Sequence, residues 1–261
     1  MTIARRNLLG YCFLIVTKPL QHSMKTLVLI HGHGVDASIW EDIKPLLQEY
    51  QVLTPDLSTE TKFKNIEEYA DGLHAWLEEI GIKKCVLIGH SMGGYLTLAF
   101  AEKYPQLLQG FGLFHSTAYA DDEAKTEQRK KTLTFMETHG AAAFIRQSGP
   151  NMYAEAYAKA HPEVIKNHVE KYAQLPTEAV IAGFKAIRNR PDRTAVLRDS
   201  NLPVLFVFWE EVKLISFEKK IELSKRYRNT HTLVLKETGH MGMVEDPKAS
   251  AEAIREFMET L

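Results

Sequence analysis

The sequence is poor in cysteine. Only two cysteines occur in 261 residues, Cys12 in an N-terminal apolar run and Cys85 in a second apolar stretch. Two isolated cysteines provide neither a disulfide framework nor a cysteine-based metal site. We therefore expect a reducing compartment and a cytoplasmic location.

The chain also lacks an excess of charge of either sign. Its 32 lysines and arginines balance 33 aspartates and glutamates, which leaves a formal net charge of −1. This balance gives no electrostatic reason to expect binding to nucleic acid or to an anionic membrane. The composition, 45% hydrophobic and 25% charged, is typical of a globular chain that is long enough for one large domain.

The N-terminal apolar run, Leu8–Val16, is too short to cross a lipid bilayer. Arg5 and Arg6 precede it and Lys18 follows it, as in a signal peptide, but no small-residue cleavage site comes after. We expect residues 1–23 to be an N-terminal extension that is not part of the domain. It either lies upstream of a working start at Met24 or forms an extra surface strand; a secretion signal is the remaining alternative.

Short apolar runs alternate with longer amphipathic segments through the rest of the chain. Apolar strands separated by helices predict an α/β fold, with a mostly parallel sheet covered by helices on both faces. The expected strands are Thr26–Ile30, Gln51–Thr54, Lys84–Ile88, Leu108–Phe114, Val204–Phe208 and Thr232–Leu235. The expected helices between them are Ile39–Glu49, Ile66–Ile80, Met92–Lys103, Glu218–Arg226 and Lys248–Thr260.

Residues 116–200 interrupt this alternation. They contain no strand pattern and read as a series of helices: Asp121–Glu137, Gly140–Gln147, Ala154–Ala160, Glu163–Gln174 and Glu178–Arg188. We expect a helical insertion over the carboxyl ends of the strands, where ligands bind in open α/β sheets. The alternative is that these helices pack on a sheet edge. The expected core is then 24–115 together with 201–261.

The most informative stretch runs from Cys85 to Gly94. Four apolar residues lead into Gly89-His90-Ser91-Met92-Gly93, and a helical pattern follows at once. A serine between two glycines at a strand-to-helix junction is the nucleophile-elbow pattern. The tight turn excludes bulky flanking side chains and places the first N–H groups of the helix beside the serine hydroxyl.

Two further elements frame this serine. The strand Thr26–Ile30 ends in His31-Gly32-His33-Gly34, a loop whose backbone N–H can form an oxyanion hole with the N–H of Met92. Two histidines without a third ligand nearby do not favour a metal site, and we expect none. His240 follows the last expected strand, at the same sheet edge as Ser91, where it is a candidate general base.

The combination of His-Gly-x-Gly, Gly-His-Ser-Met-Gly-Gly and a late Gly-His resembles the α/β-hydrolase superfamily from Met24 to the C-terminus. The resemblance implies a sheet of about eight strands with a helical cap. It also implies Ser91 as nucleophile, His240 as general base, and the N–H groups of His33 and Met92 as the oxyanion hole. Members with an aspartate nucleophile are disfavoured because position 91 is serine.

The resemblance also implies a catalytic triad whose third member is an acidic residue, usually an aspartate. At this position the chain departs from the family pattern. Where relatives carry Gly-x-x-Asp after the strand that corresponds to Val204–Phe208, this chain reads Trp209-Glu210-Glu211-Val212, so valine stands at the aspartate position. Glu211 is the favoured substitute, with Glu210 as its alternative. Asp121 or Asp122 could serve instead, or the site has no acid.

We therefore expect a serine hydrolase of small carboxylic esters or related acyl substrates that works through an acyl-enzyme and needs no cofactor. His31, Gly32, His90 and His115 are expected to line the pocket of its small-molecule substrate. Two alternatives stay open. One is a catalytically impaired ligand-binding relative without the triad acid, and the other is a carbon–carbon bond hydrolase on the same site.

Overall fold

The computed structural model describes residues 3–6, 12–15, 24–209, 227 and 229–261. The expected helix Glu218–Arg226 and the candidate acids Glu210 and Glu211 lie outside these residues. Near the N-terminus, β1 (Ile3–Arg6) and β2 (Cys12–Ile15) pair antiparallel as a sheet of their own. Neither of them joins a strand of the larger sheet.

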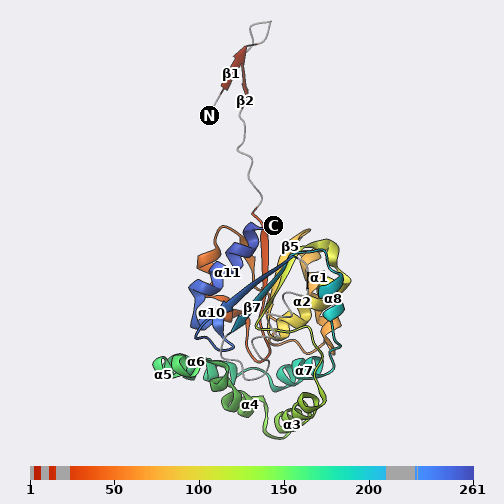
Figure 1. Ribbon diagram of the computed structural model, residues 1–261, viewed down its shortest axis with the longest axis vertical. Helices are drawn as coiled ribbons and strands as arrows, with labels where there is room; N and C mark the ends of the chain where they lie inside the picture. The colour runs from red at the N-terminus through yellow and green to blue at the C-terminus, as the bar shows by residue number, and fades with distance from the viewer. Residues whose placement is uncertain (1–2, 7–11, 16–23, 210–226, 228) are drawn as a thin grey trace.

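The larger sheet is parallel throughout and confirms the predicted α/β class (Figure 1). Its order is β4-β3-β5-β6-β7-β8, so among the described residues this sheet has six strands rather than about eight. The higher number came from the family resemblance, whereas the apolar runs of the sequence predicted these six. The strands are β3 (Thr26–Ile30), β4 (Gln51–Leu53), β5 (Cys85–His90), β6 (Leu108–Phe114), β7 (Val204–Trp209) and β8 (Thr230–Leu235).

The strand order creates a switch point between β3 and β5. From β3 the chain turns outward to β4 on one side, and from β5 it proceeds to β6 on the other side. At such a point the loops that leave the two carboxyl ends diverge and open a crevice. His31–Gly34 and Ser91 leave β3 and β5 at this place, so the topology alone brings the two motifs together.

Successive side chains of a strand point to opposite faces of the sheet, and those of the central strands are apolar on both faces. Both faces are therefore covered by other elements. On β3, Leu27 and Leu29 pack in one cluster, and Val28 and Ile30 in the other. The first face carries two 3₁₀ turns and the C-terminal helix, and the second carries three α-helices. The first set is η1 (Ala37–Trp40), η2 (Lys44–Leu47) and α11 (Pro247–Glu259), and the second is α1 (Ile66–Glu79), α2 (Met92–Lys103) and α8 (Thr194–Asp199).

The predicted helix Ile39–Glu49 is wrong. The segment forms the two short turns η1 and η2 instead. Pro45 explains the difference, because a proline inside a helix has no N–H to donate and clashes with the preceding turn. By contrast, the expected helix Ile66–Ile80 forms as α1 with a buried apolar stripe, and the side chain of Asn65 caps it by accepting from the Glu68 N–H at 2.9 Å.

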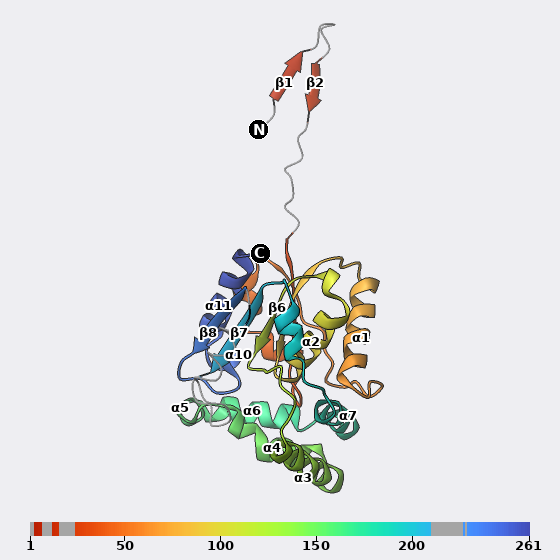
Figure 2. The ribbon, with the colours of Figure 1, turned by 45° about the vertical axis from the view of Figure 1, so that its right-hand side comes forward.

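Between β6 and β7 the chain is helical, as expected. We call residues 123–188 the helical segment; they lie together at the end of the sheet where the parallel strands finish (Figure 2). Its elements are α3 (Glu123–His139), α4 (Ala141–Ser148), η4 (Gly149–Met152), α5 (Glu155–Ala160), α6 (Pro162–Tyr172) and α7 (Thr177–Arg188).

Two buried arginines fasten the ends of this segment to the core. The Arg193 N–H donates to the Ala118 carbonyl at 2.8 Å, and its guanidinium reaches Glu67 of α1 and Glu102 of α2. Arg190 bonds the Asp121 carboxylate at 2.7 Å and the Tyr119 carbonyl at 3.1 Å. The stretches of chain that enter and leave the helical segment are thus held to each other and to α1 and α2.

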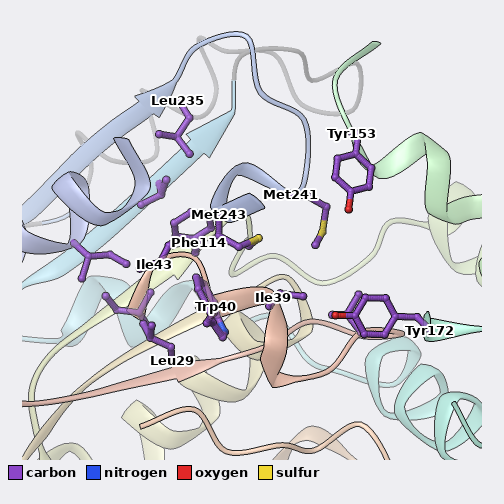
Figure 3. Packing of buried hydrophobic residues seen from close by; sticks show 14 of the residues in the cluster. Leu29, Ile39, Trp40, Ile43, Phe114, Tyr153, Tyr172, Leu235, Met241 and Met243 are labelled. Carbon is purple, nitrogen blue, oxygen red and sulfur yellow. The ribbon is translucent and has the colours of Figure 1, made fainter. Parts of the chain in front are cut away.

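One apolar cluster runs without a break from the sheet into the helical segment (Figure 3). Trp40 and Phe114 pack edge-to-face at 5.5 Å at its centre. Met241 and Met243 belong to the same cluster from the core, and Tyr153 and Tyr172 belong to it from the helical segment.

In the described part of the chain, every helix is too short or too polar to cross a membrane.

Candidate functional site

Ser91 sits on a tight turn between β5 and α2. Its backbone angles are φ 53° and ψ −113°, a region that L-residues rarely adopt. The turn closes so tightly that a Cβ at Gly89 would lie 2.0 Å from the Gly93 carbonyl oxygen. The tight strand-to-helix turn that the sequence predicted is therefore present with Ser91 at its apex, and we call this turn the elbow.

The backbone on both sides of the serine is held in place. The Ser91 N–H donates to the Phe114 carbonyl of β6 at 3.1 Å. The Ser91 carbonyl accepts from the Gly94 N–H at 3.0 Å and from the Ser116 hydroxyl at 2.7 Å. These bonds over-determine a strained conformation, which is the condition for such strain to persist at a functional position.

The loop after β3 passes directly against the serine. A Cβ at Gly32 would lie 3.2 Å from the Ser91 Cβ and 2.7 Å from Nδ1 of His90. His31 holds the loop through both ring nitrogens: Nε2 accepts from the Leu57 N–H at 2.8 Å, and Nδ1 donates to the Gly32 carbonyl at 2.8 Å. Because both nitrogens are engaged, His31 is suited to holding the backbone and not to binding a metal.

His33 connects the same loop to the helical segment. Its Nε2–H donates to the Val180 carbonyl of α7 at 2.7 Å, and its ring packs on Phe184 at 5.4 Å. Burial lowers the pKa of His33 to about 4, an effect that the bond to Val180 opposes and the nearby Arg129 increases. The ring is therefore neutral near pH 7 and acts as a tether between loop and helix.

The lowered pKa of His33 predicts how the free energy of unfolding depends on pH in the acid range. Since the pKa of His33 is lower in the folded than in the unfolded chain, the stabilisation is complete above about pH 6.5 and is lost as the pH falls toward 4. His33→Gln keeps a donor for Val180 but removes the titration. The fall in unfolding free energy between pH 7 and 4.5 should then be smaller by about 2 kcal/mol.

Urea unfolding at the two pH values measures this difference. His139→Gln, at an exposed position of α3, is the matched control and should leave the wild-type fall unchanged. Equal falls in wild type and His33→Gln would contradict the prediction.

The loop that carries His240 meets the elbow from the other side. The His240 N–H donates to the Met152 carbonyl at 2.7 Å, and its carbonyl accepts from His90 Nε2 and His115 Nδ1, both at 2.9 Å. The His240 ring lies 4.7 Å from the His90 ring, centroid to centroid. His90 directly precedes Ser91, so the fold brings the far end of the chain to the elbow.

His90 and His115 were expected to line the substrate pocket. Both rings are buried and donate to the His240 carbonyl. Burial, with the neighbouring His240 and His115 rings adding to it, holds the pKa of His90 well below its usual range. Sequence reasoning missed this supporting arrangement; its only signal was a histidine at the carboxyl end of each of three strands.

The same three histidines are the candidate metal cluster among the described residues. One nitrogen from each of His90, His115 and His240 lies within 4.8 Å of the others. Nitrogens bound to one tetrahedral zinc ion lie about 3.4 Å apart, given Zn–N bonds of about 2.1 Å. His90 and His115 each donate one ring N–H to the His240 carbonyl, as metal-ligating histidines also commonly do, so these bonds do not decide the question and the argument against a shared ion is the spacing of up to 4.8 Å.

The candidate acids differ in how their place in the chain relates to His240. β7 ends at Trp209, whose ring lies 5.1 Å from the His240 ring, so Glu210 and Glu211 follow a residue that contacts the imidazole. Asp122 instead caps α3 by accepting from the Lys125 N–H at 2.7 Å. Asp121 lies between two arginines.

Burial tends to raise the pKa of Asp121, but hydrogen bonds from Arg190 and Arg129 outweigh it and lower the pKa. This carboxylate is already committed to an ion-pair network at the root of the helical segment. Its surroundings favour a structural role over pairing with an imidazole.

A small pocket lies between the β3 loop, the start of α2 and α7. His31, Gly32, His33 and Met92 line it from the core, and Val180 and Gly183 from the helical segment. His90 and His115 do not belong to its lining. The pocket thus borders both backbone positions that the sequence predicted for an oxyanion hole.

Comparison with known proteins decides the family. Residues 27–253 match the model of the alpha/beta hydrolase family, which is most of the chain. The chain belongs to the alpha/beta hydrolase family. The matched range begins in β3 and ends in α11, so it includes Ser91 and His240.

Three relatives illustrate the range of the family. A putative carbamate hydrolase, RutD, from Pseudomonas syringae pv. syringae (strain B728a) is 24% identical over 247 residues, which are 90% of this chain and 94% of the relative. A thermophilic esterase from Thermogutta terrifontis is 27% identical with a TM-score of 0.84, and 90% of each chain is covered. The karrikin insensitive 2 receptor IA of Petunia hybrida is 36% identical over 90 residues, which are 30% of this chain and 33% of the receptor.

Proposed function

We propose that this alpha/beta hydrolase cleaves small carboxylic esters or related acyl substrates, with Ser91 as its nucleophile. The single observation that carries the proposal is the conformation of Ser91, held at φ 53° on a turn whose backbone is bonded on both sides. A protein retains such strain where the strained residue has a task. Here the task is to present a hydroxyl at the mouth of the crevice between β3 and β5.

His240 is the proposed general base. Its loop is fixed by bonds from His90 and His115, and its ring packs on the residue before Ser91. In the proposed reaction the imidazole takes the Ser91 proton while Oγ forms a bond to the substrate carbonyl carbon. The described hydrogen bonds do not include one between Oγ and this ring, and such contacts commonly tighten only in the enzyme–substrate complex.

The backbone N–H groups of His33 and Met92 are the proposed oxyanion hole. Met92 opens α2, where unpaired N–H groups and the helix dipole favour negative charge. His33 lies next to Gly32, which approaches the Ser91 side chain closely. Two donors at this place would stabilise the tetrahedral intermediate, an effect of about 10²–10³ per donor in rate.

Collapse of that intermediate breaks the bond to the leaving alcohol, which departs with the proton from His240 and leaves an acyl-Ser91 ester. Water, deprotonated by His240, then attacks the acyl carbon, and Ser91 recovers its proton as the acid is released. No step requires a cofactor. The carbamate hydrolase and esterase names among the relatives support an acyl carbon with a heteroatom leaving group.

Glu211 is the proposed acid, with Glu210 as its alternative. The support is the position of Trp209, which brings the chain into contact with the His240 ring immediately before the two glutamates. A glutamate is longer than the aspartate found at the usual position, so its carboxylate can reach an imidazole from a neighbouring place in the turn. Asp121 and Asp122 are less favoured because both carboxylates have structural partners.

Labelling with a fluorophosphonate probe, together with hydrolysis of p-nitrophenyl acetate and butyrate, tests the proposal. Wild type should take one label and turn over ester, and Ser91→Ala should do neither. Glu211→Gln should slow turnover by up to about 10⁴-fold, whereas Glu210→Gln, the matched control, should retain most of it. Ester turnover by Ser91→Ala equal to wild type would remove Ser91 from the mechanism.

A second candidate is a ligand-binding relative with little catalysis. Val212 at the usual aspartate position favours it, and one partial relative is a receptor. This candidate predicts that the folded wild type takes no fluorophosphonate label. A carbon–carbon bond hydrolase on the same residues would take the label but leave both nitrophenyl esters uncleaved.

A further inference from the structure

One carboxylate collects backbone N–H donors from two sides of the site. Glu245 ends α10 (Gly242–Glu245) and accepts from the Gly239 N–H at 3.0 Å and from the Met241 N–H at 3.2 Å. These two residues flank His240 directly. The same carboxylate also accepts from the Ala154 N–H, in the helical segment, at 2.9 Å.

At this place the backbone of Gly239 packs directly against the backbone of Tyr153 and Ala154. A Cβ at Gly239 would lie 2.4 Å from the Ala154 nitrogen and 2.5 Å from the Tyr153 carbonyl carbon. Beside this contact, the His240 N–H donates to the Met152 carbonyl at 2.7 Å. Residues 152–154 and 239–241 therefore meet in a single packed contact with Glu245 at its centre, which we call the histidine junction.

An ionised carboxylate that accepts several backbone N–H bonds is a strong and directional anchor. Here the donors Gly239, Met241 and Ala154 belong to the residues beside His240 or to the segment bonded to them. A catalytic imidazole loses rate steeply when misplaced, by about 10²-fold for an error of about 1 Å.

We infer that Glu245 is a positioning residue that sets the place of the His240 imidazole and couples it to residues 152–154 of the helical segment. The helical segment is then part of the catalytic apparatus and more than a cover for the pocket. This inference rests on the proposed function for its effect on rate, but the junction itself is a property of the fold.

The test compares Glu245→Ala and Glu245→Gln with Asp246→Ala. Asp246 is the neighbouring residue, and its carboxylate caps α11 by accepting from the Ala249 N–H at 3.0 Å instead of joining the histidine junction. Both alanine variants lose a backbone anchor at the same place in the chain, so they separate positioning from general stability.

Glu245→Ala should lower kcat for p-nitrophenyl acetate by about 10- to 100-fold with KM within about threefold. Glu245→Gln keeps one acceptor oxygen but turns its NH₂ group toward the other backbone donors, so it should recover only part of this loss. Asp246→Ala should lower the melting temperature but leave kcat within about twofold. Equal kcat in Glu245→Ala and Asp246→Ala, each measured on folded protein, would overturn the inference.

Hydrogen exchange gives a readout that does not depend on activity. In Glu245→Ala, and to a lesser degree in Glu245→Gln, peptides that cover 150–156 and 236–242 should exchange faster together, whereas Asp246→Ala should change neither. A wild type without label or turnover would refute the proposed function, and the exchange comparison would still decide the junction. Unchanged exchange in both peptides of the Glu245 variants would overturn it.

Discussion

Replacing Ser91 with glycine is expected to abolish ester hydrolysis and at the same time to raise the melting temperature. The hydroxyl is the proposed nucleophile, and in a well-studied serine hydrolase its loss costs about 10⁶-fold in kcat. The conformation of Ser91, φ 53° and ψ −113°, is strained for any residue with a Cβ and open to glycine. Relief of that strain should exceed the entropic cost of glycine.

The strain at such a residue is worth about 1–3 kcal/mol and the glycine penalty about 0.5–1 kcal/mol, so a net gain of about 1 kcal/mol is expected. In a domain of this size that gain corresponds to a rise of about 2–4 °C in melting temperature. Thermal unfolding followed by circular dichroism measures it. Rates of p-nitrophenyl acetate hydrolysis on the same samples measure the loss of activity.

Ser91→Ala is the matched control for this pair of effects. It removes the same hydroxyl but keeps the Cβ, so its activity should fall as far while its melting temperature stays near that of wild type. A glycine variant that melts no higher than the alanine variant would show that the turn stores no strain at this residue.

Replacing Gly89 with alanine is expected to prevent the protein from folding to a stable native state. The added Cβ would lie 2.0 Å from the Gly93 carbonyl oxygen, 2.1 Å from the Gly93 carbonyl carbon and 2.5 Å from the Gly94 nitrogen. All three atoms are backbone at the start of α2, and no side-chain rotation can relieve the overlap. The turn and the helix would have to move apart, at a cost beyond about 4–5 kcal/mol.

Gly81 provides the comparison. It follows α1 with φ +77°, and a Cβ there would meet no atom within 4 Å. Gly81→Ala should therefore cost only about 1 kcal/mol for its left-handed conformation. Soluble yield and urea unfolding of the two variants should differ sharply. A folded Gly89→Ala protein with near-wild-type stability would mean that the elbow is not as tight as described.

The parts of the fold that the sequence predicted well are those set by local pattern. β3, β5 and β6 followed from short apolar runs, and α1 from its apolar stripe ending before Gly81. The helix expected over Ile39–Glu49 failed because its apolar spacing outweighed Pro45 in the prediction, whereas in the fold the missing N–H breaks the helix into two turns.

The elbow and the loop after β3 could be predicted because each motif states its own geometry in a few adjacent residues. The support of His240 could not. Its partners are separated from it by 150 residues in the case of His90 and 125 in the case of His115. Glu245 is close in sequence, but its role depends on Ala154, 91 residues away, and no local pattern announces that encounter.

The arginine anchors at residues 190 and 193 limit how a substrate can reach Ser91. They tie the chain that enters the helical segment to the chain that leaves it, and they tie both to α1 and α2. A swing of the whole helical segment about this base would have to break these ion pairs. We therefore expect the proposed substrate to be admitted by movement within α3–α7 and not by rotation of the segment as one body.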